Sequence, residues 1–352
     1  MSYKGVVKYT VRRGVVLFLV VVLAIYITII VANMGGKIDE FVKGDLYLQI
    51  AQQVKRDPQY KNLPGSEQEK IIKMKYEQEI KRLGLDKPFL ERSLIYLQNA
   101  ITLNLGRALY MTSDSGSRLV RNIILERLPA TILLFTTAMV INFFIHLFLG
   151  LHLSRNYGSL FDKIVIALAP TSTIPGWFYG IFLILIFASW LHVLPYGGLV
   201  DVPPPSDPVA YALSVLKHMI LPLSSWIISG FFLGVYGTRT FFLIFSTEDY
   251  VEAARAKGLP GKLIERRYIL RPSLPPIITN FALGLIGSWS GAIITETVFN
   301  WPGLGLVTWT AIQNFDTPVI VGVTVIYAYL LAITVFLLDL IYGLVDPRIK
   351  LQ

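Results

Sequence analysis

The stretch EDYVEAARAKGLPGKLIERRYILRPSLPP, Glu248–Pro276, is a polar segment between two strongly apolar segments of the chain. Its first half, Tyr250–Lys257, consists largely of good helix formers, and an acidic pair precedes it where a helix dipole favours anions. Gly258 suits the left-handed conformation that ends a helix, and Pro260 prevents continuation. The stretch therefore predicts a short helix, a sharp corner and a second, basic helix at a membrane surface.

The composition of the chain places it among membrane proteins. Of its 352 residues, 54% are hydrophobic and only 16% are charged, which is too apolar for a soluble fold. The net charge of +9 does not indicate a nucleic-acid partner, because the basic residues form no patch interleaved with aromatic residues. Cysteine is absent, which excludes disulfides and cysteine-ligated metals. The expected fold is therefore all-α, as a polytopic membrane protein.

Six apolar runs come close to the roughly 20 residues that a helix needs to cross a bilayer. They lie at about 14–34, 128–153, 164–191, 219–245, 277–299 and 318–345. A signal peptide is the competing interpretation of the first run, but the run is too long and shows no cleavage site. We expect Pro170 and Pro175 to bend the third run and Pro222 to bend the fourth.

Basic residues in the connections predict the orientation of the spans, since cytoplasmic loops are rich in Lys and Arg. The stretch Glu248–Pro276 contains both, whereas the connections 193–216 and 300–317 contain neither. Both termini and the stretch Glu248–Pro276 are therefore expected on the cytoplasmic side of a plasma membrane.

The long connection after the first span has a mixed-charge composition and predicts a small extracytoplasmic helical insertion. We expect an N-terminus and first span, the insertion, and a core domain of five spans, at 1–36, 37–118 and 119–352. Within the insertion, Ser66 and Glu69 match a capping box for one helix. A second helix is expected to bury Leu90, Leu94, Leu97 and Ile101. Two interpretations of the insertion stay open: a stabilising cap, or a contact surface for an external solute-binding protein.

The polar stretch also carries a recognisable motif. Its residues are Glu252, Ala253, Ala254 and, after three more residues, Gly258, with a prolyl stop expected at Pro275 and Pro276. This pattern resembles the EAA loop of ABC importer permeases. Pro272 stands where such permeases usually carry Asn, and we expect this additional proline to shorten the second helix of the loop.

The resemblance extends from about Asn104 to the C-terminus. The further matching runs are Glu126–Thr131, Glu296–Phe299, Trp301–Gly305 and Asp346–Arg348. Together they resemble the first permease subunit of dipeptide and oligopeptide importers. The resemblance implies a type I importer permease with six transmembrane helices in membrane lipid. It also implies as partners a second permease subunit in a heterodimer, two ATPase subunits and an extracytoplasmic solute-binding protein.

The same resemblance implies which residues act. Glu252, Ala253, Ala254 and Gly258 would couple the chain to an ATPase subunit, with small side chains that allow close approach and Glu252 as a charged handle. The chain itself would bind no cofactor and would not be an enzyme. ATP and Mg²⁺ would be bound by the partner ATPase subunits.

An external gate or pathway segment is expected near the outer end of the fifth span. Its candidate residues are Glu296, Trp289, Trp301, Pro302 and Gly303. A capping or inter-helix hydrogen bond is the alternative role for Glu296, because charge at membrane depth normally faces a partner or water.

Other functions leave weaker traces in the sequence. The run Gly258–Leu263 has the wrong glycine spacing for a phosphate loop. His146 and His152 are six residues apart, not the four that place two metal ligands on one helical face, so no metal site is expected. An intramembrane hydrolase and a gradient-driven carrier stay open as alternatives, although neither a nucleophile–base pair nor an internal repeat stands out. Peptides are the favoured substrates and oligosaccharides the alternative.

Overall fold

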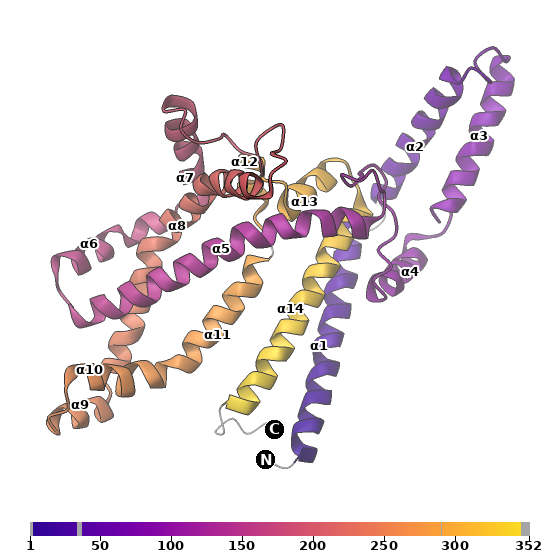
Figure 1. Ribbon diagram of the computed structural model, residues 1–352. Coiled ribbons are helices and arrows are strands. Elements are labelled where there is room, and N and C mark those ends of the chain that lie inside the picture. Colours follow the sequence, from indigo (N-terminus) through magenta and orange to yellow (C-terminus); the bar gives the residue numbers. More distant parts are fainter. Residues whose placement is uncertain (1–2, 34–36, 290, 346–352) are drawn as a thin grey trace. The chain divides into compact units, whose positions relative to one another are not determined.

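The fold is built from helices throughout the part of the chain that the structure describes. The structure is a computed structural model that describes residues 3–33, 37–289 and 291–345 (Figure 1). Within these ranges it contains no strand, only an isolated bridge between Arg107 and Leu119. The predicted all-α class is confirmed. The predicted closing motif Asp346–Arg348 lies outside the described residues.

Among the described residues, five helices are long and apolar enough to cross a membrane, and a bent helix pair can form a sixth span. The five are α1 (Tyr3–Ala32), α5 (Val120–Arg155), α8 (Pro208–Ser246), the run from α10 to α11 (Gly261–Ser288) and α14 (Thr317–Val345). This agrees with the predicted six spans when the bent pair counts as one. The chain is a multi-pass membrane protein.

The third predicted span is the bent one. Its parts are α6 (Leu160–Leu168), η2 (Ala169–Thr173), α7 (Gly176–Leu183) and η3 (Ile184–Trp190). The two halves meet at 94°, with Pro170 inside η2 and Pro175 at the start of α7. Because proline lacks a backbone donor and fixes φ, it interrupts the helix there as predicted. In contrast, α8 continues through Pro222.

The prediction was wrong for the fifth span, which was expected at 277–299. The helical run begins instead with α10 (Gly261–Ile264), passes through the π-helical η4 (Glu265–Leu270) and ends with α11 (Arg271–Ser288). The expected prolyl stop does not occur, because a π-helical turn adjusts the backbone just before the prolines and the run continues. Gly291, with φ of +67°, separates this run from the short helix α12 (Ile293–Val298), which lies outside the spans.

The chain forms two compact units. Unit 1 comprises Met1–Ile124, Thr310–Phe336 and Tyr342–Gln352, and unit 2 comprises Leu125–Trp309 and Leu337–Ile341. Helices α5, α13 (Leu304–Gln313) and α14 therefore each contribute to both units. The linear division at 36/37 and 118/119 stays a prediction.

In unit 1 the insertion consists of α2 (Lys37–Arg56), α3 (Gly65–Arg82) and α4 (Phe89–Ile101). Figure 1 shows α2 and α3 side by side, and Ile50 and Val54 pack there against Ile72. The predicted capping box at Ser66 is wrong, since α3 starts one residue earlier and its N-cap is Pro64.

The predicted buried face of α4 is also wrong in part. Leu90 is 70% exposed and Leu94 is 56% exposed, whereas Arg92 is buried. Arg92 forms an ion pair with Asp39, and Tyr26 of α1 lies 3.5 Å from the hydroxyl of Ser93. This polar pairing turns the helix away from the orientation that its leucines alone would favour.

A single carboxylate fixes the end of the insertion to a later part of unit 1. Asp316 is fully buried and accepts backbone N–H bonds from Leu109 at 3.1 Å, Tyr110 at 2.8 Å and Met111 at 3.0 Å. A carboxylate that accepts several N–H bonds is strongly stabilised, so this contact holds the segment 109–111 in one conformation.

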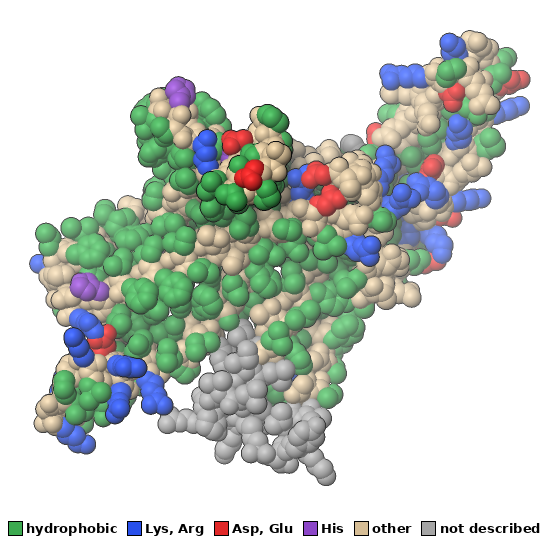
Figure 2. Space-filling model, viewed as in Figure 1, with side chains coloured by type: hydrophobic (Ala, Val, Ile, Leu, Met, Phe, Trp, Pro, Cys, Tyr) green, Lys and Arg blue, Asp and Glu red, His purple; other side chains and the backbone are tan. Residues whose placement is uncertain are grey.

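In unit 2 the main core packs around Trp301, Phe299, Leu134 and Met219. A second anchor is a buried ion pair, in which Nε and Nη2 of Arg239 donate to the two carboxylate oxygens of Asp162 at 2.8 Å each. Figure 2 shows hydrophobic side chains along α5 and α11 and Lys and Arg side chains around α9 and α10.

Candidate functional site

The polar stretch folds as a helix, a corner and a second helix, as predicted. Helix α9 (Asp249–Ala256) is followed by Gly258 with φ of +72°, and α10 starts after Pro260. The N–H groups of Gly258 and Leu259 bond back to the carbonyl oxygens of Arg255 and Ala254 at 2.9 and 3.3 Å, which closes the helix end. Figure 1 shows α9 and α10 together at one end of unit 2, with α12 at the other.

The two motif alanines face opposite ways. Ala254 is 2% exposed and packs in a cluster with Val251 and Ile264, whereas Ala253 and Glu252 are exposed. The expectation that both alanines offer a docking face is therefore corrected for Ala254. Its small size serves the packing of the loop, because a larger side chain would not fit between Val251 and Ile264.

The second half of the loop is tied to another part of unit 2. Glu265, in η4, forms an ion pair with Arg155 at the end of α5. Pro272, in the first turn of α11, does not shorten the helix as expected, because the π-helical η4 precedes it and continues into α11. The loop is thus a folded element whose second half is tied to the end of α5.

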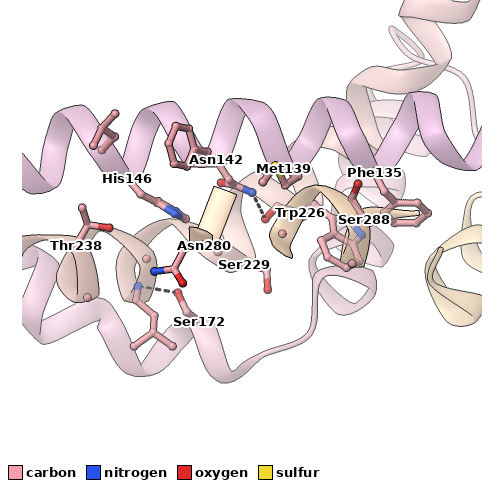
Figure 3. Close-up of a pocket in the computed structure, with 18 of the residues that line it drawn as sticks. Phe135, Met139, Asn142, His146, Ser172, Trp226, Ser229, Thr238, Asn280 and Ser288 are labelled. Carbon is pink, nitrogen blue, oxygen red and sulfur yellow. Dashed lines mark hydrogen bonds between the residues drawn. The ribbon is translucent and has the colours of Figure 1, made fainter. Parts of the chain in front are cut away.

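A cavity of about 760 Å³ lies in unit 2 among α5, α8 and α11 (Figure 3). Its polar lining comes from Asn142, His146, Ser172, Ser229, Thr238, Asn280 and Ser288. Apolar side chains such as Phe135, Met139 and Trp226 complete the wall together with several glycines. Its volume lies in the range of ligand-binding pockets.

The wall of this cavity is almost free of charge. Among its described lining residues His146 is the only one that can titrate, and none is Lys, Arg, Asp or Glu. Gly237 and Gly287 lie where an added Cβ atom would meet nothing within 4 Å. Gly234 and Gly230, in contrast, lie against the side chains of His146 and Asn142. Neighbouring side chains therefore pack closely at Gly230 and Gly234 but leave open space at Gly287.

Helices α8 and α11, which line the cavity, are also the helices that flank the loop. Helix α8 ends at Ser246, three residues before α9 begins, and α11 continues directly from η4. The loop is therefore joined to the cavity wall on both sides, by residues 247–248 to α8 and by the unbroken helical run from α10 to α11.

A buried glutamate organises the other end of unit 2. Glu296 is fully buried and accepts a hydrogen bond from the hydroxyl of Thr131 at 3.1 Å and from the N–H of Leu306 at 2.9 Å. The N–H of Leu304 donates to Thr131 at 2.7 Å. Burial raises the pKa of Glu296 to about 7, although these donors favour the charged form. The cluster therefore bears out the alternative role of Glu296 as a hydrogen-bonding group.

The segment after Glu296 is packed tightly against this cluster. Trp301 is fully buried and its indole N–H donates to the carbonyl oxygen of Ala130 at 2.9 Å. A Cβ atom on Gly303 would lie 2.4 Å from the Thr131 hydroxyl and 2.6 Å from a Glu296 oxygen, so only glycine fits. Pro302 lies between these two fixed residues and is partly buried.

The structure brings Glu296, Trp301 and Gly303 together, but outside the cavity wall. Trp289 caps the end of α11 and does not line the cavity either, so the gate role of these residues stays a prediction.

Sequence reasoning missed the lining residues Asn142 and Asn280. The signal was present, since an amide inside an apolar span normally faces a partner or water. Among the described residues, no group of three or more His, Asp or Glu could hold a metal ion.

Comparison with known proteins identifies the family of the chain. Residues 146–351 match the model of the family described as binding-protein-dependent transport system inner membrane component. The di/tripeptide transport system permease protein DppB of Pseudomonas aeruginosa is 34% identical, over 77% of this chain and 84% of the relative.

Two further relatives carry similar names. The dipeptide transport system permease protein DppB of Bacillus subtilis is 32% identical, over 76% of this chain and 82% of its own length. The dipeptide transport system permease protein DppB of Escherichia coli is 30% identical, over 78% of this chain and 85% of its own length. The chain therefore belongs to the family of inner membrane components of binding-protein-dependent transport systems, as a permease of the dipeptide and oligopeptide type.

Proposed function

We propose that this chain is a permease subunit of an ATP-driven peptide importer, and that the cavity among α5, α8 and α11 forms its share of the translocation pathway. One observation carries the proposal: the two helices that flank the loop with Glu252 and Ala253 also line the cavity. Peptides are the proposed substrates because the relatives described above are named for dipeptides or tripeptides.

The proposed mechanism is alternating access. An ATPase subunit binds the exposed face of α9 around Glu252 and Ala253, and its movement is passed to α8 and α11. These helices then open the cavity to one side of the membrane or the other. Two ATPase subunits bind ATP and Mg²⁺, a second permease subunit supplies the facing wall, and a solute-binding protein delivers the peptide. Both chain termini lie in the cytoplasm in this arrangement.

Filling the cavity tests the pathway. In the complex reconstituted in liposomes, Gly287→Leu should reduce ATP-dependent dipeptide uptake at least about tenfold, since a side chain there starts in open space and projects from the cavity wall. ATP hydrolysis should persist, because the loop is unchanged.

Gly44→Leu is the matched control, because Gly44 lies in α2, outside this cavity, and an added Cβ atom there also meets nothing within 4 Å. Normal uptake by Gly287→Leu, with the complex intact, would show that peptides do not pass through this cavity. Uptake of oligosaccharides but not of dipeptides by the unaltered complex would correct the proposed substrate.

A further inference from the structure

Unit 1 contains a second, very different cavity. It has a volume of about 560 Å³ and lies where α2, the end of α3 and the segment around 107–110 meet. Its lining includes three arginines, Arg82, Arg107 and Arg118, which we call the arginine cleft. The proposed pathway cavity has no such charge, so the two cavities suit different ligands.

The backbone holds two of these arginines in fixed positions. Arg107 forms the isolated bridge with Leu119, and the N–H of Ala108 donates to the carbonyl oxygen of Arg118 at 2.8 Å. The three N–H bonds to Asp316 fix the residues that follow directly. Arg107 and Arg118 therefore project from a rigid frame and not from a flexible loop.

The charge of the cleft is not balanced from within. Arg82 pairs with Glu79, which is the only acidic residue among the described lining residues. Arg107 and Arg118 are exposed, and no acidic side chain within the described ranges forms an ion pair with either. Guanidinium groups bind carboxylates through two parallel hydrogen bonds, so two of them free in one cleft are well suited to a carboxylate.

We propose that the arginine cleft receives acidic side chains of the solute-binding protein when it docks on the transporter. Pockets for small molecules are mostly apolar and bury their ligand, whereas this cleft presents exposed charges at its edge. Charges of that kind guide an approaching protein and set its orientation. The family is itself defined by dependence on a binding protein. This docking site rests on the proposed function, because an N-terminus in the cytoplasm puts the insertion, which follows the first span, on the side from which the solute-binding protein approaches.

The association rate of the two proteins tests the docking site. The transporter complex in lipid nanodiscs is immobilised, and the solute-binding protein of the same importer is passed over it at two salt concentrations. Arg107→Gln together with Arg118→Gln should lower the association rate constant about five- to tenfold at low salt, because steering by surface charge is lost. At about 0.5 M salt the difference should nearly vanish, since screening there acts within less than about 10 Å.

Two further variants make the result specific. Lys55→Gln with Arg56→Gln removes the same charge from exposed positions at the end of α2, outside the cleft, and should change the rate less than about twofold. Arg107→Lys with Arg118→Lys keeps the charge and should keep most of the rate. Normal ATP hydrolysis by each complex shows that the variants assemble.

The docking site is overturned if both glutamine pairs lower the rate equally, if the effect does not depend on salt, or if the lysine pair loses as much as the glutamine pair. It is also overturned if dipeptide uptake is ATP-dependent but the unaltered transporter binds the solute-binding protein no faster than the transporter with Arg107→Gln and Arg118→Gln does. Failure of the proposed function looks different, because the unaltered complex would then show no ATP-dependent uptake at all.

Discussion

Replacing Glu296 with glutamine changes the charge of the buried cluster without changing its shape. The neutral carboxyl and the amide have similar hydrogen-bonding groups, so Glu296→Gln imitates the protonated state in contact with Thr131 and Leu306. The pKa of Glu296 is raised from 4.5 to about 7 by burial, so the folded protein favours the protonated form. The stability that protonated Glu296 contributes to the folded state is fully present below about pH 4.5 and is lost as the pH rises through about 7.

The size of the effect follows from this interval. The difference between 4.5 and about 7 corresponds to about 3 kcal/mol, at about 1.4 kcal/mol for each pH unit. Replacing one acceptor oxygen by an NH2 group offsets about 1 kcal/mol of that gain. At about pH 8.5 the Glu296→Gln complex should therefore be more stable than the unaltered one by about 2 kcal/mol, and below about pH 5 this advantage should disappear.

Thermal unfolding of the complex in detergent, followed by tryptophan fluorescence at several pH values, measures this difference. Other titrating groups are common to both proteins and cancel in the comparison. Glu69→Gln, at an exposed glutamate of α3, is the control and should change Tm far less than Glu296→Gln does at about pH 8.5. Parallel Tm curves for Glu296→Gln and the unaltered protein between about pH 5 and 8.5 would refute the reasoning.

Two further substitutions probe the loop and the buried ion pair. Ala253→Arg should abolish most peptide-stimulated ATP hydrolysis without lowering Tm, because Ala253 is exposed. Ala254→Leu should overpack the buried cluster, which costs about 1–3 kcal/mol of unfolding free energy and lowers Tm. Equal losses of Tm in the two variants would contradict this division. Arg239→Met should lower the free energy of unfolding by about 3–5 kcal/mol, since it leaves the Asp162 charge buried and unpaired. Adding Asp162→Asn should recover much of that loss in denaturant titrations, and a purely additive double variant would show that the unpaired charge is not the cause.

Much of this fold could be predicted from local sequence. The apolar runs gave the number of spans when the bent pair counts as one, Pro170 and Pro175 indicated the bend of the third, and Gly258 marked the corner after α9. These features depend on chemistry within a few residues, such as the missing N–H of proline or the freedom of glycine at positive φ.

The features that sequence reasoning missed depend on distant partners. Thr131 and Glu296 are 165 residues apart, and both stood in recognisable motifs, but no local pattern indicates that they bond to each other. Asp39 similarly determines which face of α4 is buried, through its ion pair with Arg92. The lining of the cavity combines residues from four separate elements, so it could be recognised only once those elements were placed.

The three N–H bonds that Asp316 accepts also bear on how the protein is made. Leu109 and Asp316 are 207 residues apart, and ribosomes add about 5–20 residues per second. The peptide groups at 109–111 therefore wait on the order of 10–40 s for their acceptor. During that time the frame of the arginine cleft is incomplete, so the cleft acquires its final form only after almost the whole chain has been synthesised.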